Sequence, residues 1–289
     1  MVSAMKTALV MLCACAAALV PSSSAALQAP ELRDRLPQQA AVLAANTAAG
    51  ALTAGVRALI ERRDFSRAFA RGALGGALGY AGKRIAVERW TGAPFLGRAI
   101  GAAGSSIVLN ATGSGAVLDS ISIPVGPLVL GFARTRGLRP RVVVIVADVV
   151  ITAQALAKSD LHLDWERTLS VGAPVFKTAI SRIMRDGKRK NGVTIGRLII
   201  LDGTQPALED QVFSHEVVHV LQHDFFQHAW DRPLEAWLRR TVPGGGLVPA
   251  WLEFALLAPL LHDATDALND GNGILRRLTE AEAEWFERR

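Results

Sequence analysis

A chain of 289 residues is long enough to bury a substantial core, in one large domain or two modest ones. Apolar residues make up 50% of the chain and charged residues 20%, and charge interrupts the apolar runs too often for a bundle of membrane spans. The net charge of +6 favours anionic surfaces, but the arginines are spread out rather than clustered with aromatics, so we expect a globular protein that can contact a membrane surface and not nucleic acid.

Residues 1 to 26 have the pattern of a signal peptide. Residues 1 to 6 carry one positive charge, residues 7 to 20 form an apolar run, and Ser24-Ala25-Ala26 supplies small residues for cleavage. The run is short for a membrane span, so cleavage is favoured over an N-terminal anchor. We therefore expect an exported protein, periplasmic or secreted, whose mature chain begins near Leu27.

Both cysteines, Cys13 and Cys15, lie in this segment. A mature chain would then have no disulfide, no thiolate nucleophile and no cysteine-bound zinc, so a metal site would have to use histidine and carboxylate. Residues 12 to 15 also loosely resemble a lipobox, and a lipoprotein is the weaker alternative.

The region from residue 27 to residue 104 is rich in alanine and glycine and predicts packed helices. Apolar residues recur at helical spacing between residues 30 and 63, and polar side chains among them favour a packed helix over a span. The stretch GALGGALGYAG, residues 72 to 82, lacks the lysine of a P-loop and follows no convincing strand. It predicts tight helix packing, against another helix or against lipid, rather than a phosphate site.

Residues 105 to 205 predict a β-rich, mostly antiparallel region. Six runs separated by turn signals have the residue types of strands: SSIVLNA, VLDSISI, LVLGFAR, RVVVIVA, VVITAQALA and GVTIGRLIIL. The clearest alternation is LHLDWERTLSV, residues 161 to 171, which has the period of a strand with one exposed face. The cationic stretch RDGKRKNG, residues 185 to 192, is interpreted as a solvated hairpin tip.

Residues 206 to 289 predict helices. One runs from residue 206 to residue 226, shorter ones cover residues 231 to 240 and 250 to 261, and the last reaches Arg289. The overall expectation is an α+β fold with a helical N-terminal part, a β-rich middle and a helical C-terminal part.

The stretch SHEVVHVLQHDFF, residues 214 to 226, is the strongest functional signal. Residues four apart share one face of a helix, so His215 and His219 can point their imidazoles at one ion. Glu216 is rotated about a quarter turn away, where its carboxylate can take a proton from water held by that ion. These residue types fit Zn²⁺, with Glu216 as the general base.

His223 continues the histidine stripe, but it lies about 11 Å along the axis from His215, which favours a place beside the ligands or at the surface over ligation. The third ligand must come from elsewhere, and LTEAEAEWF near the C-terminus offers three carboxylates. Glu280 and Glu284 share one helix face, whereas Glu282 projects to another. We expect Glu280 to bind the metal and Glu284 to hydrogen-bond to a ligand histidine. Glu282 and Glu284 are the alternative ligands. The non-functional alternative is that all three glutamates belong to the solvated acidic end of a helix.

Together the two stretches resemble the gluzincin group of zinc metallopeptidases. In that group an H-E-x-x-H helix is joined by a later helix carrying E-x-x-x-[D/E], to which EAEAE is similar, and the resemblance covers residues 212 to 286. It implies zinc on the two histidines and Glu280, and catalysis by Glu216. It also implies that a strand before the helix, at residues 193 to 201, pairs with an extended peptide substrate.

Enzymes of this group use tyrosine, histidine or arginine to stabilise the oxyanion, and this chain offers no clear candidate. Its one tyrosine, Tyr80, lies far upstream in the sequence. His228, His262 and the Arg276-Arg277 pair are substitutes among which the sequence does not choose. Residues 247 to 261, LVPAWLEFALLAPLL, predict a buried or interfacial helix.

The sequence thus predicts an exported zinc-dependent hydrolase, a metallopeptidase acting on a peptide or protein substrate. One alternative is a non-catalytic, membrane-associated envelope protein with a structural or vestigial zinc site. Another is a binding module whose histidines only pack. The intact Glu216 favours the hydrolase, because a structural zinc site gains nothing from a base there. Nothing in the sequence indicates the oligomeric state.

Overall fold

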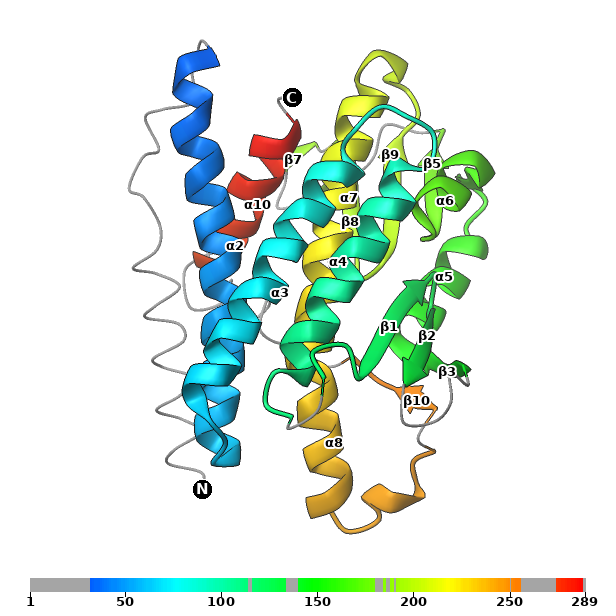
Figure 1. Ribbon diagram of the computed structural model, residues 1–289. Helices are drawn as coiled ribbons and strands as arrows, with labels where there is room; N and C mark the ends of the chain where they lie inside the picture. The colour runs from blue at the N-terminus through cyan, green and yellow to red at the C-terminus, as the bar shows by residue number, and fades with distance from the viewer. Residues whose placement is uncertain are drawn as a thin grey trace.

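The computed structural model describes residues 32–113, 116–133, 140–179, 184–185, 188–189, 191–249, 251–255 and 274–287 (Figure 1). Over these residues the chain has the predicted α+β fold. Helices predominate, and two small mixed sheets lie together along one side of them. The predicted signal peptide and both cysteines lie outside the described residues.

Three helices lie side by side at the N-terminal edge of the molecule: α2 (Leu32–Glu61), α3 (Phe65–Ala86) and α4 (Ala93–Asn110) (Figure 1). Glycines let them approach closely. A Cβ on Gly76 of α3 would lie 2.1 Å from the carbonyl oxygen of Asn46 on α2, and one on Gly82 would lie 2.5 Å from that of Gly97 on α4. Any side chain there would force the helices apart, so the tight packing predicted for residues 72 to 82 is confirmed.

Helix α2 contains a segment, Pro37–Glu61, that is long and apolar enough to cross a membrane, the one such helix in the described part of the chain. Its mean hydropathy is 1.2, and a third of the apolar window is buried against the rest of the protein. Core helices and membrane spans both meet this criterion, so it decides little by itself.

The strands form two four-stranded sheets and one short hairpin. The first sheet has the order β1-β2-β3-β10, with strands β1 (Ser120–Val125), β2 (Leu128–Ala133), β3 (Pro140–Ile145) and β10 (Leu252–Glu253). The second has the order β4-β5-β9-β8, with strands β4 (Leu161–Leu163), β5 (Val175–Thr178), β9 (Leu198–Asp202) and β8 (Gly192–Ile195). The hairpin joins β6 (Met184–Arg185) and β7 (Lys188–Arg189) within the predicted cationic hairpin, whose turn residues are not described. Antiparallel pairs predominate, but β3 with β10 and β5 with β9 are parallel.

Three segments predicted as strands are helical. SSIVLNA ends α4, VVITAQALA lies in α5 (Val146–Leu156), and most of LHLDWERTLSV forms α6 (Trp165–Val171). In the last case the local capping signals outweigh the alternating pattern. The Asp164 carboxylate accepts a hydrogen bond from the backbone N–H of Arg167 and starts the helix, and Gly172, at a φ of 67°, ends it.

The C-terminal predictions are confirmed except for one segment. Helix α7 (Glu209–Phe226) follows a 3₁₀ turn, η2 (Pro206–Leu208), and continues through a π-helical stretch, η3 (Gln227–Asp231), into α8 (Arg232–Thr241). A helix was predicted for residues 250 to 261. The structure describes residues 251 to 255 of this range, and they contain strand β10 and no helix. The last helix is α10 (Ile274–Glu287), and a short 3₁₀ turn, η4 (Gly245–Leu247), follows α8.

Helix α7 is the centre of the core. On one side Val217, Val220 and Leu221 pack with Val175, Ile199 and Leu201 of the second sheet. On another side Val218 packs with Ala283 and Phe286 of α10. The C-terminal helix is therefore held against the H-E-x-x-H helix by apolar burial.

A buried ionic cluster joins α7 to α4, α5 and the turn between β8 and β9. The Asp224 carboxylate lies 2.7 Å from Nε of Arg98 on α4 and 2.5 Å from Nε of Arg197, in the β8–β9 turn. Nη1 of Arg197 lies 2.9 Å from the carboxylate of Asp148 on α5. Burial opposes ionisation of Asp224, but the two guanidinium groups outweigh it and hold the pKa of that carboxyl well below its usual range.

Candidate metal centre

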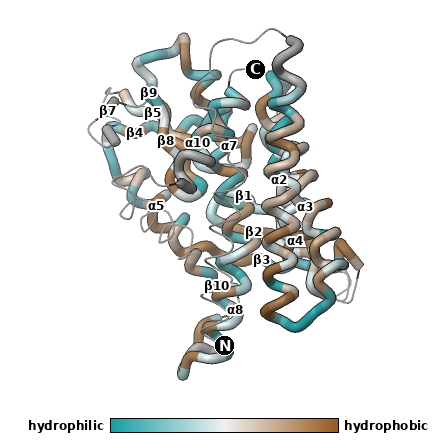
Figure 2. The backbone as a smooth tube through the Cα atoms, turned by 90° about the vertical axis from the view of Figure 1, so that its left-hand side faces the viewer, coloured by the Kyte–Doolittle hydropathy of each residue, from teal (hydrophilic) through white to brown (hydrophobic). Residues whose placement is uncertain are grey.

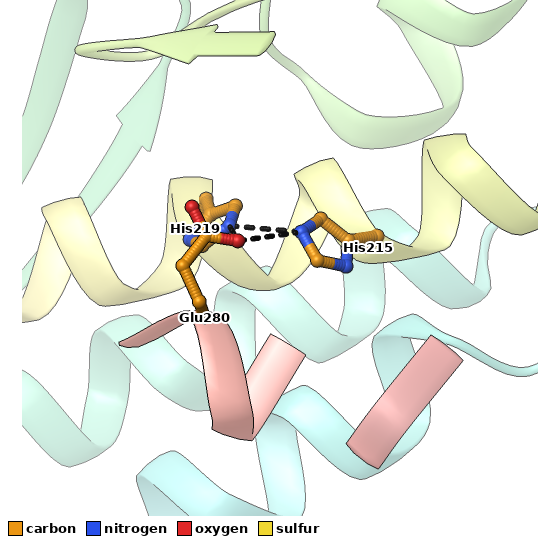
Figure 3. Close-up of side chains that lie close together, drawn as sticks. All are labelled: His215, His219 and Glu280. Atoms are coloured by element: carbon orange, nitrogen blue, oxygen red, sulfur yellow. Dashed lines mark hydrogen bonds and ion pairs between the residues drawn. The ribbon is translucent and has the colours of Figure 1, made fainter. Parts of the chain in front are cut away.

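The two histidines of the H-E-x-x-H helix and a glutamate of the C-terminal helix meet at one point (Figure 3). His215 and His219 lie one turn apart on α7, and their Nε2 atoms are 3.1 Å apart. Oε2 of Glu280, on α10, lies 3.4 Å from Nε2 of His215 and 3.6 Å from Nε2 of His219. In the described part of the chain this is the one group of three such side chains that could hold a metal ion.

The three atoms have a spacing that is compatible with a zinc ion. A triangle with sides of 3.1, 3.4 and 3.6 Å has a circumradius of about 2.0 Å, which matches zinc–nitrogen and zinc–oxygen bond lengths of about 2.0–2.2 Å. Two neutral imidazoles and one carboxylate also form a donor set that zinc takes at catalytic sites, where a fourth position stays open. The residues present therefore fit the predicted ion in both distance and donor type.

The second nitrogen of His219 is held by Gln222. Nδ1 of His219 lies 2.8 Å from Oε1 of Gln222, whose own amide nitrogen donates to the carboxylate of Glu282 and to the carbonyl of Thr279, at 2.8 and 3.0 Å. An amide oxygen only accepts, so the ring proton of His219 lies on Nδ1 and leaves Nε2 free to bind a metal.

The second nitrogen of His215 is held by Glu287. Its Nδ1 lies 2.9 Å from Oε2 of that carboxylate, in the place that we predicted for Glu284. The reason is the direction of α10. Gln222 contacts Thr279 and His215 contacts Glu287, so the two helices run antiparallel, and a residue two turns beyond Glu280 reaches the earlier histidine.

These contacts leave the centre short of positive charge. With both ring protons on Nδ1, two nitrogen lone pairs and one carboxylate point at the same space, which only a cation or a shared proton can satisfy. Burial disfavours a charged ring, yet the carboxylates of Glu280 and Glu287 outweigh it and raise the pKa of His215 to about 10. The centre therefore favours one positive charge, which a proton or a metal ion can supply.

Glu216 lies on the side of α7 that faces strand β8. Its Oε2 accepts a hydrogen bond from the hydroxyl of Thr194 at 2.7 Å, and a Cβ on Gly192 would lie 2.9 Å from its Oε1. The side chain is 5% exposed, and burial raises the pKa of its carboxyl, with His219 and His215 acting in the opposite direction. A raised pKa suits a general base.

The strand that covers Glu216 was predicted as one segment from residue 193 to residue 201. It is instead a hairpin of β8 and β9, closed at Gly196, whose φ is 61°. Among the described residues, strand β8 ends the order of the second sheet and pairs with β9 alone. Its other edge has no partner strand in that part of the chain, and the family resemblance predicts that a substrate strand pairs there.

Two other predicted residues, His223 and His228, are not part of the group of ligands. His223 lies near Asp148 and Arg197 of the ionic cluster, and burial lowers its pKa. His228 is fully buried about 13 Å along the helix from His219, its ring donates to the carbonyl of Asp224 at 2.7 Å, and burial lowers its pKa to about 3.

Tyr80, remote in the sequence, is brought against the helix that carries Glu280. Its ring centre lies 6.4 Å from that of Trp285 and 6.0 Å from that of Phe286. The side chains of His262 and Arg276-Arg277 lie outside the described residues. The oxyanion-stabilising group therefore stays unassigned.

The sequence did not predict the support behind Gln222. Glu282 accepts from Nζ of Lys83 at 2.7 Å and from the amide of Asn46 at 2.6 Å, and these two residues also contact each other at 2.9 Å. The sequence offered one signal for this support: Lys83 is a charged side chain in the glycine-rich helix α3, where close packing predicts an acidic partner. The chain of contacts ties α2 and α3 to His219.

Removing this support is expected to weaken zinc binding. A Gln222→Ala variant should bind zinc about 10- to 100-fold less tightly, because His219 loses the partner that fixes its orientation and proton. Competition with a chromophoric chelator measures the affinity. Gln211→Ala, an exposed residue of the same helix, is the matched control, and equal affinities for the two variants would contradict the assignment.

Zinc binding is also expected to release a proton at neutral pH. His215 is protonated below its raised pKa of about 10, and a metal must displace that proton. Affinity should therefore rise with pH across the neutral range and fall in acid. Calorimetric titrations in buffers with different ionisation enthalpies count the protons, and a count of zero would exclude this charge state.

A wide cleft of about 1510 Å³ opens beside the centre. Ser214 and Glu287, which adjoin or contact His215, lie at its wall, and α6 and the α3–α4 turn form other parts of it. Its ionic groups largely pair with one another, since Arg167 contacts Asp164, Glu209 and Asp210. The apolar side chains of the wall are exposed to solvent: Trp165 is 67% and Leu169 74% exposed.

No protein-family model, no curated protein and no solved structure matches this chain. The resemblance to gluzincins thus rests on the two short stretches that carry it. The geometry brings those stretches together, but the identity of the ion and the reaction stay predictions.

Proposed function

We propose that this protein is an exported zinc-dependent hydrolase that cleaves peptide bonds. The observation that carries the proposal is the convergence of two imidazole Nε2 atoms and the Glu280 carboxylate on one point, with both Nδ1 atoms already engaged. A purely structural site would not need Glu216, which is buried beside the histidines and hydrogen-bonded to Thr194.

The protein's own groups have separate roles in this reaction. Bound zinc supplies positive charge that acidifies water and polarises the substrate carbonyl. Glu216 takes the proton of the attacking water and returns it to the leaving amine, and Thr194 holds its carboxylate in one orientation. Glu287 and Gln222 keep the ring protons of the ligand histidines on Nδ1.

The substrate class follows from the surroundings of the centre. The edge of β8 that has no partner strand among the described residues supports an extended main chain, and the exposed apolar wall of the neighbouring cleft supports bulky apolar side chains. Because Arg167 and Lys177 pair with the acidic groups beside them, these ionic groups of the cleft leave little basis for selecting a charged ligand. An unfolded polypeptide rich in apolar side chains is the substrate that meets both conditions.

The test combines metal analysis with hydrolysis. We expect one zinc per purified chain, loss of that zinc in His215→Ala, and cleavage of an unfolded protein that stops on chelation and returns on zinc addition. Absence of bound zinc after loading would refute the proposal. Zinc without any hydrolysis would instead support the alternative, an envelope protein with a structural or vestigial site.

A further inference from the structure

Two protrusions lie at the same end of the molecule, opposite the end where α7 begins (Figures 1 and 2). The first is the turn between α2 and α3. The second is the end of α8 with the described residues that follow it, residues 242 to 249 and Trp251. In both views these two protrusions point the same way, beyond the body formed by the other described elements.

The first tip combines exposed apolar side chains with arginines, of which Arg62, Arg63 and Arg67 are exposed. Leu59 is 63% exposed, and Ile60, Phe65 and Phe69 are also open to solvent. Between Arg57 and Arg71 the chain has five arginines and two acidic residues, and each acid already has a local partner: Glu61 pairs with Arg57, and Asp64 caps α3. The tip therefore presents a net positive charge around apolar side chains.

The second tip likewise combines exposed apolar side chains with arginines, at the end of α8 and in the segment that follows it. Leu247 is 86% exposed, and Val242 and Trp251 are exposed beside it. Arg239 holds the loop by donating to the carbonyls of Val248 and Pro249, at 3.2 and 2.8 Å. Arg240, at the end of α8, is exposed. The loop is thus shaped by contacts that leave its apolar side chains outward.

We propose that these two tips dock the protein on an anionic lipid bilayer. Aromatic and aliphatic side chains enter the interfacial region of a bilayer, while arginines beside them pair with anionic headgroups. Charge complementarity distinguishes this partner from a neutral apolar surface. The inference does not depend on the metal or on hydrolysis.

Docking in this way places the metal centre above the bilayer. Helix α7, η3 and α8 run without a break from Glu209 to Thr241, and His219 precedes Thr241 by 22 residues. At 1.5 Å per residue the centre lies about 33 Å from the tip along that axis. The protein would then reach substrates that stand away from the membrane surface rather than ones within the bilayer.

The test is sedimentation of the full chain with vesicles of phosphatidylcholine, with and without phosphatidylglycerol. We expect binding to the mixed vesicles, weakening with added salt, and at least about a tenfold loss in Leu59→Glu/Phe65→Glu and in Leu247→Glu/Trp251→Glu. Leu156→Glu/Trp165→Glu replaces equally exposed apolar side chains away from this end and should bind like wild type. Circular dichroism checks that every variant is folded. All variants keep the same N-terminal segment, so differences in vesicle binding between them do not come from that segment.

Any of the following results would overturn the inference. Wild-type protein that does not sediment with mixed vesicles, or that binds neutral vesicles equally well, would exclude an anionic bilayer as the partner. Tip variants that bind as tightly as wild type, or control variants that lose as much binding, would exclude these tips as the surface. Light scattering that shows self-association lost in the tip variants, without vesicle binding, would assign the tips to a contact between copies of the chain.

Discussion

A Glu216→Gln variant is expected to hydrolyse an unfolded protein about 10²- to 10⁴-fold more slowly than wild type while binding zinc equally well. The amide keeps the size of the side chain and a hydrogen-bonding oxygen for Thr194, but it does not accept a proton from water. Steady-state rates together with the zinc content of the same preparations make the measurement.

Glu61→Gln, a surface glutamate paired with Arg57, is the control for the same chemical change and should keep its activity. Loss of zinc in Glu216→Gln would show that the carboxylate supports the metal instead of acting as a base. Unchanged hydrolysis with full zinc would assign the proton transfer to another group.

An Asp224→Ala variant is expected to lose about 3–5 kcal/mol of unfolding free energy. The carboxylate lies between Arg98 and Arg197, and without it both buried guanidinium groups lose their shared counter-charge. Because the cluster joins α4, α5 and the β8–β9 turn to α7, the loss affects the frame of the whole site. Denaturant unfolding followed by circular dichroism measures it.

Asp210→Ala, on the same helix, is the matched control. Its carboxylate is 97% exposed and pairs with Arg167 at the surface, so its removal should cost less than about 1 kcal/mol. If Asp224→Ala is too unstable to purify, Asp148→Ala removes only the contact to Arg197 and should give a smaller loss. Equal stabilities of Asp224→Ala and Asp210→Ala would show that the cluster contributes nothing.

Vesicle binding, zinc uptake and hydrolysis are separable in this protein. The tips lie at one end of the long helix and the histidines toward the other, so tip variants should keep their zinc. The vesicle-binding proposal can therefore fail without deciding the zinc and hydrolysis proposals, and those can fail without deciding it.

The secondary structure could be predicted where short-range patterns are strong. Residues 209 to 226 and 274 to 287 are helical because apolar residues recur at helical spacing, and that spacing also aligns His215 with His219. The prediction was wrong at residues 165 to 171, where an alternation of period two coincided with the Asp164 cap and the Gly172 stop of a helix. Capping contacts are local, so the sequence contained this signal, but the period-two alternation predicted a strand in its place.

By itself the sequence determined the residue types of the centre and the spacing of its two histidines, because one helical turn is a local property of the chain. Only the tertiary structure decided which carboxylates face them. Glu280 and Glu287 reach the histidines because α10 packs antiparallel on α7, and Glu282 turns instead to Lys83 and Gln222. Apolar contacts such as Val218 with Ala283 set that packing, and such contacts between distant segments leave no periodic signal in the sequence.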